Sequence, residues 1–146
     1  MEIKIIKTES EEYRQSLLLR DKILRQPLGL NLFHENLDKE VYDIHIGVFL
    51  NRHIIGVLIL SPLNADAIKM RQVAVDDAYQ GQGIGTQLVA FAEKTAKDSG
   101  YRQIVLHARK TAVPFYLKMH YHVVGNEFIE VCIPHYKMVK EIKDYI

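Results

Sequence analysis

Residues 73–86 read Val73-Ala74-Val75-Asp76-Asp77-Ala78-Tyr79-Gln80-Gly81-Gln82-Gly83-Ile84-Gly85-Thr86, and the arrangement of the chain can be worked out from this stretch. A run of β-branched and small residues ends at Val75 and predicts the end of a strand. Glycines then alternate through residues 81–85, which is typical of a turn. From Ile84 the apolar residues recur at helical spacing as far as Gly100, where the predicted helix ends.

A junction of strand, glycine-rich turn and helix can bind an anion through its main chain. The first N–H groups of a helix lack intrahelical partners and carry partial positive charge, and glycines let an anion approach closely. A P-loop ends in Gly-Lys-Ser/Thr, and this segment, Gly83-Ile84-Gly85-Thr86, has no lysine there, so that motif is excluded. The dinucleotide-binding fingerprint needs Gly or Ala at the position that Thr86 occupies. The remaining pattern, Gln-x-x-Gly-x-Gly, is met at Gln80, Gly83 and Gly85. A turn that only caps the helix is the alternative interpretation.

The segments on either side of this junction predict six further strands and further helices. Alternating or β-branched runs predict strands over 2–7, 41–49, 54–60, 104–107, 121–125 and 128–139, in addition to 67–75. Thr8 and Glu11 have capping-box spacing and predict a helix that ends near Arg25, before Pro27. A short helical turn is expected over 35–41 and a helix over 112–119. This order predicts a mixed α/β sheet with helices on both faces, in a single domain over residues 1–146.

The composition is that of an ordinary globular protein and disfavours several classes of function. Hydrophobic residues make up 48% of the 146 residues and charged residues 25%. Nineteen basic and eighteen acidic residues give a net charge of +1, whereas nucleic-acid-binding proteins usually carry a basic excess. The longest apolar run, Ile54–Leu60, is far shorter than the roughly 20 residues that span a bilayer. We therefore expect no nucleic-acid partner and no membrane segment.

The chain has one cysteine, Cys132, which rules out an internal disulfide. A lone thiol fits the reducing cytoplasm, and we expect Cys132 to be a small core residue. His120 and His122 have no nearby carboxylate or thiol in the sequence to complete a metal site, so no metal is expected.

Two segments resemble known motifs of one family. Residues 73–86 resemble motif A of the GNAT superfamily of acetyl-CoA-dependent N-acetyltransferases. Downstream, Ala112-Val113-Pro114-Phe115-Tyr116-Leu117-Lys118 is similar to the A-x-x-F-Y-x-K segment of the same family. There are two departures: Arg109 stands where many members have Asn, and His120-Tyr121 stands where they have Gly-Phe.

The resemblance implies the GNAT-type fold, which has a mostly antiparallel sheet with one parallel, splayed pair of strands. It implies that acetyl-CoA is the co-substrate and that an amine attacks the thioester directly, without a covalent enzyme intermediate. Tyr116 would be the catalytic proton donor to the departing thiolate, although its ring could also serve packing alone. The Val73 N–H would polarise the thioester carbonyl. The cofactor-binding residues implied are Val73, Ala74, Val75, Gln80, Gly81, Gln82, Gly83, Ile84, Gly85 and Thr86.

Other roles stay open at this level. Glu130, His135 or a water chain could be the general base, because the two side chains flank Ile133-Pro134 on strands expected near the cleft. Arg25 could bind an acceptor carboxylate or be a solvated helix-end arginine. The acceptor could be a small amine, an amino acid or a protein amine, and the size of the acyl group is undetermined. A homodimer is compatible with the family. The alternative function is a non-catalytic acyl-CoA sensor or interaction module.

Overall fold

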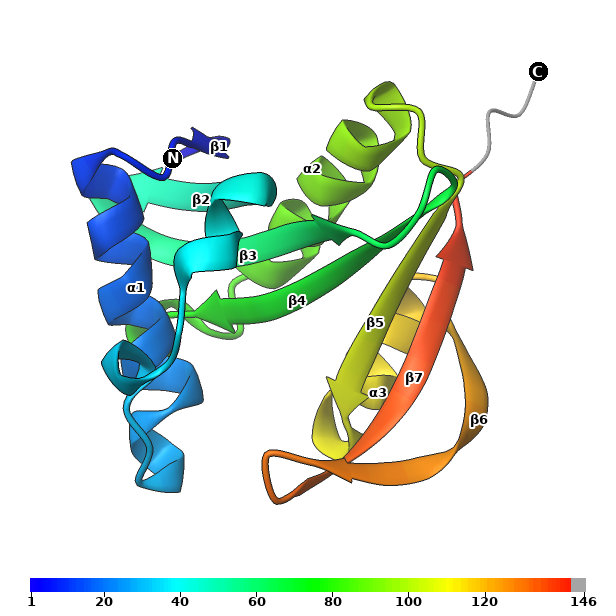
Figure 1. The fold of residues 1–146 in the computed structure, drawn as a ribbon. Coiled ribbons are helices and arrows are strands. Elements are labelled where there is room, and N and C mark those ends of the chain that lie inside the picture. Colours follow the sequence, from blue (N-terminus) through cyan, green and yellow to red (C-terminus); the bar gives the residue numbers. More distant parts are fainter. Residues whose placement is uncertain (143–146) are drawn as a thin grey trace.

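Seven strands form one continuous sheet in the computed structural model, which describes residues 1–142 (Figure 1). The spatial order is β1-β2-β3-β4-β5-β7-β6, and every neighbouring pair is antiparallel except β4 and β5, which are parallel. The mixed sheet with one parallel pair is therefore confirmed. The strands are β1 (Glu2–Ile6), β2 (Ile44–Leu50), β3 (His53–Pro62), β4 (Ala67–Val75), β5 (Gln103–Arg109), β6 (His122–Glu130) and β7 (Ile133–Glu141).

Helices lie on both faces of the sheet, as the sequence predicted. Helix α1 (Glu11–Leu24) packs on β3 and β4 from one side, and α2 (Ile84–Asp98) packs on β2, β3 and β4 from the other (Figure 1). Helix α3 (Val113–Lys118) lies beside β5. Among residues 1–142, no helix is both long and apolar enough to cross a membrane. Short 3-10 helices span Gln26–Leu28, Leu32–His34, Asp38–Tyr42, Asp77–Tyr79 and Lys110–Ala112.

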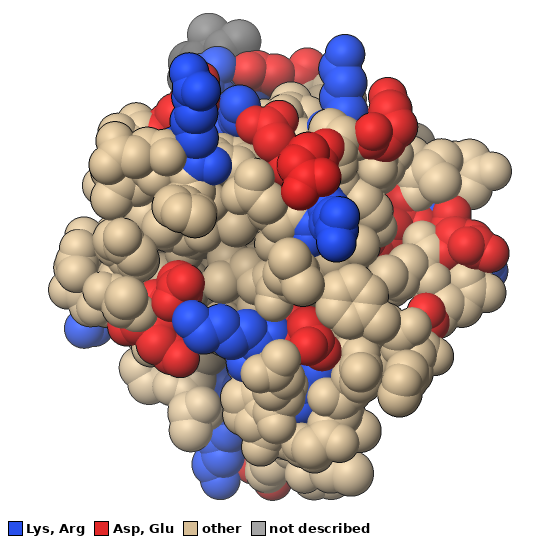
Figure 2. Space-filling view, turned by 90° about the vertical axis from the view of Figure 1, so that its left-hand side faces the viewer, with Lys and Arg blue, Asp and Glu red and all other residues tan. Residues whose placement is uncertain are grey.

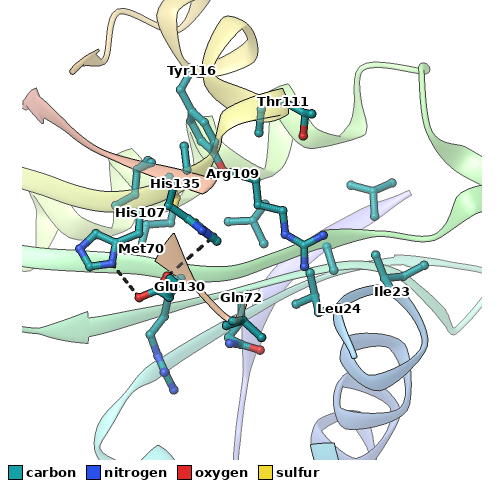
Figure 3. A pocket seen from close by; sticks show the side chains of 18 of the residues that line it. Ile23, Leu24, Met70, Gln72, His107, Arg109, Thr111, Tyr116, Glu130 and His135 are labelled. Carbon is teal, nitrogen blue, oxygen red and sulfur yellow. Dashed lines mark hydrogen bonds and ion pairs between the residues drawn. The ribbon is translucent and has the colours of Figure 1, made fainter. Parts of the chain in front are cut away.

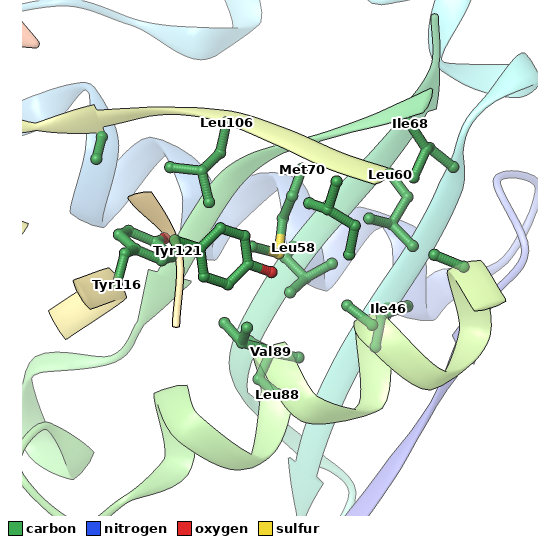
Figure 4. Close-up of a cluster of buried hydrophobic side chains, with 14 of the residues drawn as sticks. Ile46, Leu58, Leu60, Ile68, Met70, Leu88, Val89, Leu106, Tyr116 and Tyr121 are labelled. Carbon is green, nitrogen blue, oxygen red and sulfur yellow. The ribbon is translucent and has the colours of Figure 1, made fainter. Parts of the chain in front are cut away.

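The main hydrophobic core lies between the sheet and α2. Leu88 and Val89 of α2 are fully buried against side chains of the central strands, and Tyr116 and Tyr121 close one end of the cluster (Figure 4). A smaller cluster under α1 is built on Leu19. Because apolar burial is the main stabilising contribution to folding, these clusters fix where β4, α2 and α3 meet.

A buried ion pair holds α1 to the segment before β2. Both terminal guanidinium nitrogens of Arg20 donate to the carboxylate of Glu40, over 2.8 and 2.7 Å. The Tyr13 hydroxyl also donates to Glu40, over 2.7 Å. Such a pair is fully hydrogen-bonded, which a buried charge requires.

Several element boundaries differ from the prediction by one to three residues, and at two of them the structure shows the cause. The N-cap of α1 is Ser10, whose side chain accepts the Tyr13 N–H, whereas Thr8 lies in the preceding turn. Strand β2 begins at Ile44, three residues later than expected, because Asp38–Tyr42 forms a 3-10 helix that turns Glu40 inward. The buried pair with Arg20 outweighs the strand preference of Val41 and Tyr42, which are exposed.

The hairpin between β6 and β7 also differs from the prediction. The turn falls at Val131 and Cys132, both with positive φ, and not at residues 126–127. Gly125 has a positive φ at an irregularity within β6, between Val124 and Phe128, so the chain continues as one strand through residues 126–127. Cys132 is consequently exposed at the turn, and its assignment as a core residue was wrong.

Candidate active site

The site lies where the parallel pair of strands separates. β4 and β5 are paired only from Ala67–Gln103 to Met70–Leu106. Gln72 then has a φ of 55°, and the β3–β4 register shifts at this point, so β4 contains a bulge. A cavity of about 620 Å³ opens beside the separated ends of β4 and β5. Its volume is in the range of small-molecule sites.

The unpaired edge of β4 faces this cavity. The Asp76 N–H donates to the Ile55 carbonyl of β3 over 2.8 Å, so the backbone groups of Asp76 point toward β3. Because backbone groups alternate along a strand, those of Val73 and Val75 point to the other side, where β5 has separated. Gln80 Nε2 donates to the Val75 carbonyl over 3.0 Å and so joins this edge to the glycine-rich turn. The edge can pair with an extended ligand.

The glycine-rich turn ends at the first turn of α2. Gly81 and Gly83 have φ values of 78° and 79°, a conformation that suits glycine, and Gly83 is the N-cap of the helix. Among residues 1–142, the backbone N–H groups of residues 81–86 donate to no protein acceptor. These N–H groups and the positive end of the helix dipole make a main-chain cradle that could hold an anion.

Tyr116 lines the same cavity from α3. Its side chain is 6% exposed, and burial raises the pKa of its phenol to about 12. Edge-to-face contacts with Phe115 and Tyr121 fix its ring. The hydroxyl makes no hydrogen bond within the described part of the chain, whereas the Tyr121 hydroxyl donates to Glu93. The phenol is therefore protonated at neutral pH and available to a ligand.

Three polar side chains, those of His107, Glu130 and His135, meet in the lining of the cavity (Figure 3). His107 Nδ1 lies 3.1 Å from Glu130 Oε1, and His135 Nε2 lies 3.7 Å from Glu130 Oε2. Phe128 stacks on the His135 ring and meets His107 edge-on. Burial raises the pKa of Glu130, but the hydrogen bond with His107 and the electrostatic influence of His107, Lys69 and His135 outweigh it, and the net shift is downward. The base candidates Glu130 and His135 are thus brought together.

His107 and Arg109 are cavity residues that the sequence analysis missed as a site. Both point away from the core, in alternation with buried Leu106 and Ala108 on β5. The signal was present, because two polar residues alternate with apolar ones at the end of a strand. The sequence of β5 alone does not indicate that Glu130 of β6 and His135 of β7 lie close to these two residues.

The cavity wall is rich in positive charge. Arg25, Lys69, Arg71 and Arg109 line it, together with the single carboxylate of Glu130. The Nε–H of Arg25 donates to Glu35 Oε2 over 2.6 Å. Arg71 Nη2 lies 3.4 Å from Glu40 Oε2. The outer surface is different, because Lys and Arg are interspersed with Asp and Glu on the face that Figure 2 shows.

Among residues 1–142, no group of three or more His, Cys, Asp or Glu side chains is arranged to hold a metal ion. The main-chain cradle of residues 81–86 fits a pyrophosphate, and the Val73–Val75 edge fits an extended amide-containing arm. Both are parts of coenzyme A, so the described residues fit an acyl-CoA thioester.

Comparison with known proteins agrees with this geometry. Residues 30–142 match the acetyltransferase (GNAT) domain family. The uncharacterized N-acetyltransferase YjcF of Bacillus subtilis is 35% identical over 74 residues, which cover 50% of this chain and 53% of YjcF. The chain thus spans about half the length of that relative. YitI, an uncharacterized N-acetyltransferase of the same organism, is 26% identical over 88% of this chain and 87% of its own length.

Solved structures share the fold at low sequence identity. An aminoglycoside 6'-N-acetyltransferase in complex with coenzyme A has a TM-score of 0.82 at 17% identity, over 100% of this chain and 99% of that one. A GNAT family acetyltransferase from Elizabethkingia anophelis with acetyl-CoA bound has a TM-score of 0.72 at 19% identity, over 96% and 97%. The chain belongs to the GNAT family of acetyltransferases, of which a solved member has acetyl-CoA bound.

Proposed function

We propose that this protein is an N-acetyltransferase that moves the acetyl group of acetyl-CoA directly onto a primary amine. One observation carries the proposal: the β4 edge at Val73 and Val75, the start of the glycine-rich turn at Gln80, and the unpartnered hydroxyl of Tyr116 all border one cavity. The same cavity also contains the Glu130–His135 pair. A binding edge, a proton donor and a candidate base therefore surround a single space.

Each part of the binding edge has a distinct task. The N–H groups of residues 81–86 hold the pyrophosphate of acetyl-CoA, which supplies the activated acetyl thioester. The backbone of Val73 and Val75 pairs with the extended arm as an added strand would. The Val73 N–H donates a hydrogen bond to the thioester carbonyl and polarises it for attack.

Tyr116 is the proposed proton donor. A thiolate leaving group has a reference pKa near 8.5, below the value of about 12 that burial gives Tyr116. The phenol therefore stays protonated and donates a hydrogen bond to the thiolate as it develops, and the ring contact with Tyr121 keeps the hydroxyl in the cavity.

His135 is the proposed base, with Glu130 beside it. His135 Nδ1 lies 2.8 Å from the Ile133 carbonyl, which only accepts, so this nitrogen carries the proton of the neutral ring. Nε2 is then left with a lone pair next to Glu130, whose carboxylate stabilises the imidazolium that forms. If His135 is the base, His135→Gln should lower kcat while the affinity for acetyl-CoA is retained. If water or Glu130 serves instead, the kcat of the variant should stay near the wild-type value.

The first test is calorimetric titration with acetyl-CoA, with CoA, NAD and ATP as comparisons. We expect selective binding of acetyl-CoA and CoA, followed by thiol release when an amine is added. Absence of acetyl-CoA binding by folded protein contradicts the proposal. Binding without thiol release across a broad amine panel indicates the acyl-CoA sensor instead.

Two wider features are also proposed. We propose that the single acetyltransferase domain acts as a homodimer, because β6 is an edge strand whose exposed side chains include Val123, Val124 and Ile129.

We also propose a cytoplasmic location, which the exposed thiol of Cys132 supports, because a lone exposed cysteine persists best in a reducing compartment.

A further inference from the structure

Arg109 extends from the end of β5 into the cavity, toward the last turn of α1 (Figure 3). Within the described residues 1–142, its guanidinium makes no hydrogen bond and no ion pair. A guanidinium carries five N–H donors, and a partly buried one usually finds an acceptor in the protein. The donors of Arg109 therefore point into the ligand space without a protein partner.

The charges around Arg109 favour an anion beside it. Arg25 also lines the cavity, and burial together with the positive charge of Arg25 lowers the pKa of Arg109. Arg25 has a carboxylate partner outside the cavity in Glu35, whereas Arg109 has no such partner among residues 1–142. A ligand anion at Arg109 would compensate an unpaired, partly desolvated charge, which is where a charge-assisted hydrogen bond is strongest.

Arg109 is also placed directly across from the proposed base. Arg109 of β5 and His135 of β7 are register partners in an antiparallel pair. Side chains directly opposite in such a pair start about 5 Å apart and share one face of the sheet. An anion at Arg109 and an amine at His135 are therefore close enough to belong to one small molecule.

We propose that the acetyl acceptor is an amino-acid-like molecule whose carboxylate is bound by Arg109 while its amine faces His135. This inference rests on the N-acetyltransferase function proposed above. A guanidinium matches the two oxygens of a carboxylate through parallel hydrogen bonds. The Glu130 carboxylate in the same cavity disfavours a doubly charged phosphate by repulsion. The positive wall likewise disfavours acceptors with several amino groups and no acid.

The experiment compares matched acceptors. Free amino acids are assayed by thiol release beside their carboxamides, the corresponding amines without the carboxyl group, and aminophosphonate analogues. We expect the carboxylates to exceed the carboxamides about 10- to 100-fold in kcat/KM, the range that one charged hydrogen-bonded contact supplies. Arg109→Gln should abolish this preference through the KM for the acceptor, with the KM for acetyl-CoA unchanged, and Arg109→Lys should restore part of it.

Lys110→Gln is the matched control, because it removes the same charge from the next residue, whose side chain is exposed and paired with Glu127. It should keep the full carboxylate preference. Equal rates with carboxamides, a preference that survives in Arg109→Gln, or higher rates with phosphonates would each overturn the inference. A raised KM for acetyl-CoA in Arg109→Gln would also overturn it, since Arg109 would then bind the co-substrate. Failure of thiol release with every amine counts instead against the proposed function.

Discussion

At the scale of single residues, we expect loss of the Tyr116 hydroxyl to have the largest effect on turnover. Tyr116→Phe removes it and leaves the ring contacts with Phe115 and Tyr121 in place. Because proton donors of this kind contribute roughly 100-fold or more, we expect turnover to fall by that factor while the affinity for acetyl-CoA is retained. Steady-state kinetics beside calorimetry separates the two quantities.

Tyr121→Phe is the control for this substitution. It also deletes a buried phenol hydroxyl, but that hydroxyl donates to Glu93 over 2.8 Å and lies outside the cavity. We expect lower thermal stability and near-normal turnover from Tyr121→Phe. If Tyr116→Phe keeps full turnover, the ring of Tyr116 serves packing alone.

Gly83 is the second residue with a specific expectation. A Cβ at this position meets no atom within 4 Å, but a φ of 79° strains any side chain, and a carboxylate would occupy the anion site. We expect Gly83→Glu to abolish acetyl-CoA binding in calorimetry. Gly100→Glu is the control, because Gly100 has a φ of 92° and equally open surroundings at the other end of α2. If folded Gly83→Glu protein keeps its affinity for acetyl-CoA, the proposed binding of the pyrophosphate by residues 81–86 is contradicted.

At the scale of elements, α1 depends on its buried ion pair with the segment before β2. Glu40→Gln leaves the guanidinium of Arg20 buried without its counter-charge, and we expect a loss of about 3 kcal/mol in the free energy of unfolding. Chemical denaturation measures this loss. Glu12→Gln removes one side of the more exposed pair with Lys4, and we expect a much smaller loss of stability from it.

The same element predicts a pH dependence of stability. Burial raises the pKa of Glu40, but hydrogen bonds from Arg20 and Tyr13 outweigh it and leave the pKa below the ordinary value of 4.5. A depressed pKa stabilises the fold above the unfolded value, and that contribution is lost as the pH falls through the folded one. The difference in unfolding free energy between wild type and Glu40→Gln should therefore shrink below pH 4.5. A difference that stays constant down to strongly acidic pH would argue against the ionised pair.

The elements also show where local sequence patterns were sufficient. Strand β4 has the predicted bounds, and α2 begins beside Gly83, because β-branched runs, glycines and helical periodicity act locally. The hairpin at Val131 and Cys132 was misplaced because neither residue is a turn former, and pairing of β6 with β7 imposes their positive φ.

At the scale of the whole molecule, the two edges of the sheet differ in what they expose. Most of β6 is exposed, including Val124 and Ile129, and we expect light scattering to give a dimer mass for the wild type. Val124→Lys combined with Ile129→Lys should shift the mass to a monomer, because lysine on an edge strand opposes pairing. Ile5→Lys, an equally exposed position on the opposite edge strand β1, should leave the dimer intact. A monomer mass for the wild type in light scattering would rule out the proposed homodimer.

The sequence by itself determined the glycine-rich turn at residues 81–85, the helix behind it and the succession of strands along the chain on either side. Those features depend on backbone conformations and apolar periodicities that neighbouring residues set. The grouping of His107, Arg109, Glu130 and His135 was decided by the tertiary structure alone. These side chains come from three strands, and their meeting depends on the register of β5 with β7 and on the bulge at Gln72 that separates β4 from β5. Both features involve contacts between residues far apart in the chain, which the pattern of any one segment does not specify.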